Sequence, residues 1–195
     1  MLSYDESLKI LKETNALLEG HFILSSGLHS NKYIQCAKLL SFPKKAEVIC
    51  LSLCKKIKQN FKDIDIILSP AIGGIVVGYE VGRQLGLETI FAERLDGKLL
   101  LRRDFKIKEK SRVLIVEDVI TTGKSVLECA KIIQSFKSKL LGYACIIDRT
   151  NNKVLTKHKI ISLIKLEIET FKENDLPNEL KKIKAIKPGS RNLSK

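Results

Sequence analysis

Residues 112–125, with the sequence RVLIVEDVITTGKS, limit the folds open to this chain more than any other stretch. They open with an apolar, β-branched run at residues 113–116, which is typical of a strand buried on both faces. Two adjacent acids, Glu117 and Asp118, follow, and then a short polar loop with one glycine. Apolar residues at helical spacing begin directly after the loop. This order of strand, polar loop and helix predicts one βα unit.

The loop after the two acids has the composition of a phosphate-binding turn. Its small residues are Thr121, Thr122, Gly123 and Ser125. At the start of a helix, backbone N–H groups and the positive end of the helix dipole converge on an anion, and a glycine lets the backbone approach the ligand. The residue types favour a site for a phosphorylated sugar, in which the loop holds the phosphate and the two carboxylates accept hydrogen bonds from the ring hydroxyls.

Two other interpretations fit this stretch less well. In the first, the strand is an ordinary core strand and its two acids are a solvated cap, but paired acids at the carboxyl end of a strand are poor cap chemistry. In the second, Gly123-Lys124-Ser125 belongs to a nucleoside-triphosphate loop, which needs a glycine five positions before Gly123. Position 118 is Asp, so the sequence excludes that loop.

A second strand, turn and helix precedes this unit. The strand is predicted over residues 64–68 and the helix over residues 75–85, with the turn SPAIGG at residues 69–74 between them. Small residues in this turn leave backbone N–H groups exposed at a helix start. Paired glycines also occur in ordinary tight turns. This turn indicates a second phosphate site only in combination with the phosphate site predicted at residues 121–125.

Apolar strands and amphipathic helices alternate along the rest of the chain. Further strands are predicted over residues 89–94, 140–147 and 160–166, helices over residues 3–18, 43–58 and 126–136, short helices over residues 167–173 and 177–183, and hairpins near residues 21–35 and 95–105. His29 is interpreted as a surface histidine in a polar turn. The alternation predicts an α/β fold with a parallel sheet covered by helices on both faces. Ligands bind such sheets beyond the carboxyl ends of the strands, where both turns, the two acids and Arg149 fall.

The net charge of +13 is compatible with a nucleic-acid partner, but the distribution of the basic residues argues against one. Of the 35 basic residues, 28 are Lys, they are scattered among Ile and Leu, and Trp is absent. We therefore expect solvated basic faces and no nucleic-acid partner. A basic field would still help to attract a polyanionic small substrate.

Length and cysteine content indicate a cytoplasmic protein of one domain. A chain of 195 residues suits a single domain with a sizeable core. No apolar run approaches the roughly 18 residues that span a membrane, and the N-terminus lacks the pattern of a secretory signal. The five cysteines, which have no C-x-x-C spacing, are expected to be buried thiols in a reducing compartment.

Residues 113–125 resemble, at all thirteen positions, the phosphoribosyl-pyrophosphate (PRPP) motif of the type I phosphoribosyltransferases. Four other segments resemble the orotate phosphoribosyltransferases of that family: GHFILSSG at residues 20–27, SPAIGG at 69–74, Asp148-Arg149, and KPGSR at 187–191. The resemblance spans nearly the whole chain. It implies the type I phosphoribosyltransferase fold, a central parallel sheet flanked by helices, as a single domain over residues 1–195. A small hood would be contributed by about residues 1–40 and the C-terminal tail.

The resemblance also implies an activity: transfer of the phosphoribosyl group from PRPP to orotate, giving orotidine 5′-monophosphate and pyrophosphate, in pyrimidine biosynthesis. The implied PRPP-binding residues are Ala71, Ile72, Gly73, Gly74, Glu117, Asp118, Val119, Ile120, Thr121, Thr122, Gly123, Lys124 and Ser125. The implied catalytic residues are Glu117, Asp118, Arg94 and Lys98, and the implied orotate contacts are Thr121 and Arg149. Arg102 and Arg103 also match the basic loop of the family. An ion pair between Arg149 and Asp148 is the alternative role for that arginine.

The same resemblance implies Mg²⁺ as cofactor, held mainly by the substrate and not by protein ligands, and a homodimer in which a basic loop is shared across the interface. Many family members carry a lysine where Ser25 stands, so this chain departs from the pattern there. Enzymes for 6-oxopurines usually carry an aspartate where Thr121 stands, which favours orotate. A regulatory protein that senses PRPP and binds nucleic acid is the alternative, but the N-terminal segment is short for an added DNA-binding element.

Overall fold

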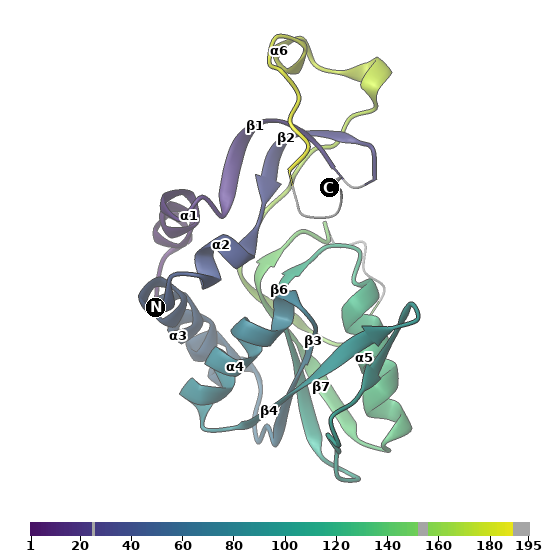
Figure 1. Cartoon of the computed structure of the whole chain (residues 1–195). Helices are drawn as coiled ribbons and strands as arrows, with labels where there is room; N and C mark the ends of the chain where they lie inside the picture. Colours follow the sequence, from purple (N-terminus) through teal and green to yellow (C-terminus); the bar gives the residue numbers. More distant parts are fainter. Residues whose placement is uncertain (25, 152–155, 189–195) are drawn as a thin grey trace.

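The computed structural model of this chain describes residues 1–24, 26–151 and 156–188 (Figure 1). Ser25, where family members carry a lysine, lies outside the described residues. So do residues 189–191 of the C-terminal KPGSR segment.

Six strands form the central sheet, in the order β5-β4-β3-β6-β7-β8. Their bounds are β3 (Ile66–Pro70), β4 (Glu88–Leu95), β5 (Lys98–Leu101), β6 (Arg112–Ile120), β7 (Lys139–Asp148) and β8 (Ile160–Lys165). All neighbouring pairs are parallel except β4 and β5, which form an antiparallel hairpin at one edge. The predicted central parallel sheet flanked by helices is confirmed, with one antiparallel edge strand added.

Strand β6 lies between β3 and β7 and carries the acids beyond its apolar run. Val113, Leu114, Ile115 and Val116 are fully buried, as expected for a strand covered on both faces. The strand extends beyond the apolar run from which it was predicted, because pairing with β7 continues through Glu117 opposite Cys145 to Ile120 opposite Asp148. Both acids therefore lie within a strand of the sheet and not in a loop.

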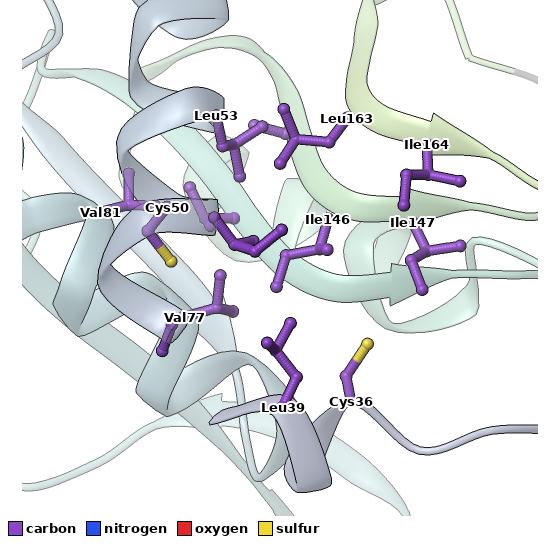
Figure 2. Close-up of a cluster of buried hydrophobic side chains, with 14 of the residues drawn as sticks. Cys36, Leu39, Cys50, Leu53, Val77, Val81, Ile146, Ile147, Leu163 and Ile164 are labelled. Atoms are coloured by element: carbon purple, nitrogen blue, oxygen red, sulfur yellow. The ribbon is translucent and has the colours of Figure 1, made fainter. Parts of the chain in front are cut away.

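Helices cover both faces of the sheet (Figure 1). The helices are α1 (Tyr4–Glu13), α2 (Cys36–Leu40), α3 (Pro43–Asn60), α4 (Gly73–Leu85), α5 (Lys124–Ser135) and α6 (Asn178–Lys181), with a 3₁₀ turn η1 (Glu173–Asp175). On one face, side chains of α3 and α4 such as Leu53 and Val81 pack against sheet residues such as Ile146 (Figure 2). On the other face, Val126 of α5 packs against Ile115 of β6. Alternate residues of the central strands β3, β6 and β7 supply the two cores.

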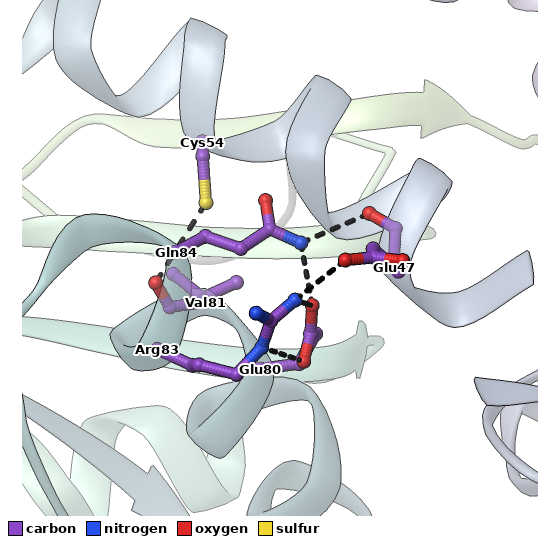
Figure 3. Close-up of polar contacts among 6 residues, drawn as sticks. All are labelled: Glu47, Cys54, Glu80, Val81, Arg83 and Gln84. Carbon is purple, nitrogen blue, oxygen red and sulfur yellow. Dashed lines mark hydrogen bonds and ion pairs between the residues drawn. The ribbon is translucent and has the colours of Figure 1, made fainter. Parts of the chain in front are cut away.

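A polar network fixes α4 against α3 (Figure 3). Arg83 of α4 lies 2.8 Å from carboxylate oxygens of both Glu47 and Glu80, and the Gln84 amide donates to the Glu47 carbonyl at 2.9 Å. Exposed ion pairs contribute little singly, but this network joins two helices at several points. It holds the helix whose first residue, Gly73, belongs to one of the predicted phosphate turns.

Gly142 of β7 lies where the sheet leaves no room for a side chain. A Cβ atom at this position would lie 2.7 Å from the Lys159 carbonyl oxygen and 2.6 Å from Cζ of Phe61. The register of β7 against β6 shifts beside it, between Val113 and Leu114, and glycine in a strand interior often marks such a bulge or close backbone approach.

We therefore expect Gly142→Ala to destabilise the fold by about 1–3 kcal/mol through overpacking against a backbone atom that cannot rotate away. Urea unfolding followed by circular dichroism measures the change. A loss of less than about 0.5 kcal/mol, the usual range for an unconstrained surface site, would show that β8 moves aside without cost.

The N-terminal helix is shorter than its periodicity predicts. The helix predicted over residues 3–18 ends at Glu13, and β1 (Leu17–Ile23) begins four residues later and pairs with β2 (His29–Ile34) in an antiparallel hairpin. Asn15 adopts a left-handed conformation (φ 54°) that no continuing helix allows. Leu17 and Leu18 keep the helical spacing of the apolar positions, but strand pairing with β2 decides their conformation.

His29 is buried, so its interpretation as a surface residue is wrong. It is 6% exposed and its Nδ1 lies 2.6 Å from Nε2 of His21, which is 4% exposed. Nδ1 of His21 lies 2.8 Å from the Ile183 carbonyl oxygen, so it must carry a hydrogen and donate. The two histidines thus link the β1–β2 hairpin to the C-terminal segment.

The short helix predicted over residues 167–173 does not form. The chain instead lies along the β1–β2 hairpin in extended form, and the 3₁₀ turn η1 begins only at Glu173. The backbone of Phe171 exchanges both hydrogen bonds with that of His29, at 2.8 and 2.9 Å, and the Glu169 carbonyl accepts the Ser30 hydroxyl at 3.0 Å. Edge pairing with β2 satisfies these backbone groups, which outweighs the weak helical periodicity of a seven-residue stretch.

All five cysteines are buried and form no disulfide, as the sequence predicts. Burial raises the pKa of each thiol, which keeps them protonated and unreactive. Among the described residues, no helix combines the length and the apolar character that crossing a bilayer requires.

Candidate functional site

Two uncapped helix starts lie at the carboxyl edge of the sheet. Helix α5 begins after Gly123, which has φ 75°, and helix α4 begins after Ile72; neither N-cap residue makes a side-chain capping hydrogen bond. The first N–H groups of a helix have no partner within the helix. Both helix starts therefore present donors and a positive dipole end to an anion.

The loop that follows β6 encloses a pocket of about 70 Å³. Its lining residues are Glu117, Val119, Ile120, Thr121, Thr122, Gly123, Lys124 and Ser125. Within the loop, the Thr122 hydroxyl accepts only a long hydrogen bond, 3.4 Å, from the Lys124 N–H. Eight of the thirteen residues predicted to bind PRPP thus lie together around one small polar pocket.

The second predicted turn approaches the acids closely. A Cβ atom on Gly73 would lie 2.8 Å from Oδ1 of Asp118 and 3.0 Å from Oδ2, and one on Gly74 would lie 3.3 Å from the Val116 carbonyl oxygen. Only glycine fits at position 73 without displacing the carboxylate. The tertiary structure therefore brings the 71–74 turn against Asp118, which follows Gly73 by 45 residues in the sequence.

The two acids are half-buried, and no basic side chain pairs with either of them among the described residues. Burial, with a further contribution from the charge of Asp118, raises the pKa of Glu117 to about 8, and burial also raises the pKa of Asp118. Asp118 Oδ1 accepts the N–H of Val119 at 2.9 Å, a contact that partly opposes the shift. In the part of the chain that the structure describes, neither acid forms an ion pair. Such a pair of acids favours a ligand that brings positive charge.

The raised pKa of Glu117 has a consequence for stability. Between pH 4.5, its ordinary pKa, and about pH 8, the folded protein keeps a proton that the unfolded chain releases, so the stability of the wild type falls as pH rises through this window. We expect Glu117→Gln, which has no charge to bury, to exceed the wild type in thermal midpoint by roughly 4–8 °C at pH 8.5, for an effect of about 2 kcal/mol.

At pH 5 the wild type and Glu117→Gln should unfold within about 2 °C of each other, because the side chain at position 117 is then neutral in both folded proteins. Differential scanning calorimetry at the two pH values measures the difference. An equal gap at both would mean that the glutamate is ionised in the folded protein across the range.

Arg149 lies beside Thr121 at the end of β7. Its N–H donates to the Ile120 carbonyl at 2.8 Å, which joins the ends of β6 and β7. The Nε atom of Arg149 is buried and has no hydrogen-bond partner among the described residues, and burial lowers the pKa of the guanidinium. The carboxylate of Asp148 accepts the N–H of Thr150 at 2.8 Å, and among the described residues it forms no ion pair with Arg149. A buried, unsatisfied donor of this kind fits an anionic or carbonyl-bearing ligand.

The basic residues of the β4–β5 hairpin have different surroundings. The Arg103 guanidinium forms a two-bond contact with Glu93, at 2.9 and 3.0 Å, and lies 5.7 Å from the centre of the Phe91 ring. Arg94 forms an ion pair of 2.9 Å with Glu128 of α5. Lys98 is exposed. The 71–74 turn begins beside β4, because the Ala71 N–H donates to the Ala92 carbonyl at 2.7 Å, two residues before Arg94. Arg103, in contrast, already has a structural partner.

Glu128 was not identified from the sequence. It is the only acid in α5 and follows directly after an apolar pair, Val126 and Leu127. An isolated acid on an otherwise neutral or basic helix was the available signal, but its partner on β4 becomes evident only in the folded chain.

Comparisons with known proteins agree with this geometry. The phosphoribosyl transferase domain family matches residues 43–180. The orotate phosphoribosyltransferase of Caldicellulosiruptor bescii is 48% identical over 97% of this chain and 99% of its own, and that of Caldicellulosiruptor saccharolyticus is 46% identical over 95% and 96%. The crystal structure of orotate phosphoribosyltransferase from Aeropyrum pernix superposes with a TM-score of 0.71 at 25% identity, over 81% of this chain and 92% of its own.

The match to the domain family covers well over half of the chain, and both relatives are aligned along nearly their full length. The chain therefore belongs to the phosphoribosyltransferase family and, within it, to the orotate phosphoribosyltransferases.

Proposed function

We propose that this protein transfers the phosphoribosyl group of PRPP to orotate in pyrimidine biosynthesis. N1 of orotate forms a bond to C1′ of the ribose, while the bond from C1′ to pyrophosphate breaks and its electron pair leaves with pyrophosphate. The observation that carries the proposal is the convergence of two uncapped helix starts on a pair of half-buried acids that form no ion pair among the described residues. Membership of the family supports it.

The loop at residues 121–125 would hold the 5′-phosphate of PRPP. Its open N–H groups at the start of α5, its hydroxyls and Lys124 are all donors to a dianion. The turn at residues 71–74 would bind the pyrophosphate in the same way at the start of α4. Because this turn packs against Asp118, the ribose between the two phosphate groups would lie over the acids.

Glu117 and Asp118 would hold the ribose hydroxyls and stabilise the positive charge that builds on the ring. Charge that develops beside preorganised carboxylates in a buried site is stabilised more than in water, because the carboxylates need not reorient. The pKa values of both acids are raised chiefly by burial, and among the described residues no cation stabilises their ionised forms. An arriving cation-like ring lowers those pKa values again, so binding of the transition state and ionisation of the acids favour each other.

Mg²⁺ is part of the proposal, held mainly by oxygens of PRPP, as this ion prefers. Within the described residues, no three His, Cys, Asp or Glu side chains gather as a metal site. The two unpaired acids fit a substrate that arrives with a divalent cation. When bound, the ion would neutralise charge on the leaving pyrophosphate, and Arg94 and Lys98 would add to that charge balance.

We also propose that residues 1–195 act as one domain with a hood, that the protein is a cytoplasmic homodimer, and that the basic hairpin is shared across the interface. Exposed apolar side chains on α4 support a protein–protein contact, since Val76 is 48% exposed and Tyr79 65%. The five free thiols support a reducing compartment. Sedimentation equilibrium tests the assembly, since a dimer has twice the 22.0 kDa mass of the chain.

Incubation with PRPP, Mg²⁺ and orotate, followed by the loss of orotate absorbance, tests the reaction. We expect turnover that requires all three components and produces one pyrophosphate for each orotate consumed. Turnover with adenine, hypoxanthine or uracil in place of orotate would keep the reaction class and overturn the substrate. Absence of turnover with every base would overturn the enzymatic proposal.

A further inference from the structure

Arg94 lies on the face of β4 that meets α5. Side chains alternate along a strand, and the preceding residues on the same face, Ile90 and Ala92, are buried in the core that α5 covers. The next side chain on that face, Arg94, emerges beside α5 near the carboxyl edge of the sheet. Figure 1 shows the β4–β5 hairpin running alongside α5.

Two contacts hold the Arg94 guanidinium in this place. Its Nη2 lies 2.9 Å from Oε2 of Glu128, and its Nη1 donates to the carbonyl of Gly97 in the hairpin turn at 2.5 Å. The Glu128 side chain is only 24% exposed, and its Oε2 is buried without a well-aligned hydrogen bond. The contact is therefore a charge pairing that orients the guanidinium but leaves its Nε–H and other hydrogens available to a ligand.

This ion pair stands next to the candidate site. Glu128 is one helical turn from Lys124, the first residue of α5. The charges of Glu117 and Glu128 both raise the pKa of the buried Cys129 thiol, and Arg94 opposes them. Lys124 and Glu117 line the same pocket, so Glu128 lies one helical turn from the candidate site.

We propose that Glu128 is a positioning residue for PRPP: it holds the Arg94 guanidinium beside the phosphate loop, ready to bind the pyrophosphate group. An arginine left loose must lose its side-chain freedom when the ligand binds, and an oriented one has lost it already. The inference rests on the proposed function, since it assigns a role within the same site. A purely structural role is a weak alternative, because α5 is anchored by Val126, Cys129 and Ile133 in the core, and partly exposed ion pairs add little stability.

Calorimetric titration with PRPP and Mg²⁺ tests this role in Glu128→Gln, which keeps the size of the side chain and removes its charge. We expect the Kd for PRPP to rise about 5–10-fold, the range for one side chain that must be immobilised on binding. The KM for orotate should change less than about twofold and the thermal midpoint should stay within about 2 °C. Glu128→Asp, which keeps the charge, should recover part of the loss. Glu13→Gln, which removes the exposed pair with Lys45 at 2.8 Å, serves as the matched control and should bind PRPP like the wild type.

A double-mutant cycle with Arg94→Ala decides whether Glu128 acts through the arginine. We expect Arg94→Ala to weaken PRPP binding by itself and Glu128→Gln to add less than about twofold in that background. Equal effects of Glu128→Gln in both backgrounds, tighter PRPP binding, or an equal loss for orotate would each overturn the inference. The titration measures binding and does not depend on turnover. If the wild-type protein binds PRPP but does not consume orotate, the proposed reaction is overturned and the role of Glu128 is not.

Discussion

Asp118→Asn is expected to lower kcat by about 10²–10³-fold, the range for removal of one preorganised electrostatic group, while the thermal midpoint stays equal or rises. Asn keeps the size of the side chain and an oxygen that can accept the Val119 N–H, which Asp118 accepts at 2.9 Å. It loses the negative charge that would face the ribose cation. Because burial raises the pKa of Asp118, its charged form is unfavourable in the folded protein, and its removal relieves that cost.

Steady-state rates with saturating PRPP and orotate, together with calorimetry of the free proteins, measure both quantities. Asp63→Asn provides a matched control, because Asp63 is an exposed acid that pairs with Arg112 at 3.1 Å, at the opposite, amino-terminal edge of the sheet. We expect that variant to keep the wild-type kcat. An unchanged rate in Asp118→Asn, or a rate loss matched by loss of folded protein, would contradict the electrostatic role of the acid.

Arg149→Lys should raise the KM for orotate by about 10–100-fold and leave the Kd for PRPP within about twofold. The charge remains, but the planar fork that binds a carboxylate with two parallel hydrogen bonds is lost. Hydrogen bonds to charged groups contribute about 1.5–3 kcal/mol, which corresponds to this range of affinity. The buried Nε of Arg149, unpartnered among the described residues, is the donor that this ligand would satisfy.

Steady-state kinetics with each substrate varied in turn separate the two effects. Arg112→Lys changes the same residue type at the far edge of the sheet, where the guanidinium pairs with Asp65 at 2.8 Å, and its KM for orotate should match the wild type. A rise in the KM for PRPP equal to that for orotate would place Arg149 in phosphate binding instead.

Much of the fold is predictable from local pattern because its elements obey simple periodicities. The β-branched run of β6 and the helical spacing of α5 each allow one conformation that buries their apolar side chains. The same holds for α3, predicted over residues 43–58 and observed as Pro43–Asn60. The differences from prediction fall where pairing with a distant segment decides conformation: the end of α1, the extension of β6, and residues 167–173.

The candidate site divides in a similar way. The loop at residues 119–125 is contiguous, so its composition alone indicates a phosphate site. The approach of Gly73 to Asp118 joins segments that only the crossover helix and the sheet bring together. The ion pair of Arg94 with Glu128 and the burial of His29 against His21 likewise have no local signature. The residues around one partner do not indicate which other residue it will contact.

The sequence by itself determined the class of fold, the phosphate loop and the pair of acids, since those depend on residues that are neighbours along the chain. Only the tertiary structure decided the surroundings of each basic group in the site. Among the described residues Arg149 lacks a partner for Nε, Arg103 is bound to Glu93 by two hydrogen bonds, and Arg94 is oriented by one ion pair with Glu128. The physical reason is that burial and pairing are properties of surfaces brought together by folding. The type of a residue determines which ligands it can bind. Its neighbours in the folded chain determine which of its hydrogen-bonding groups are still available to a ligand.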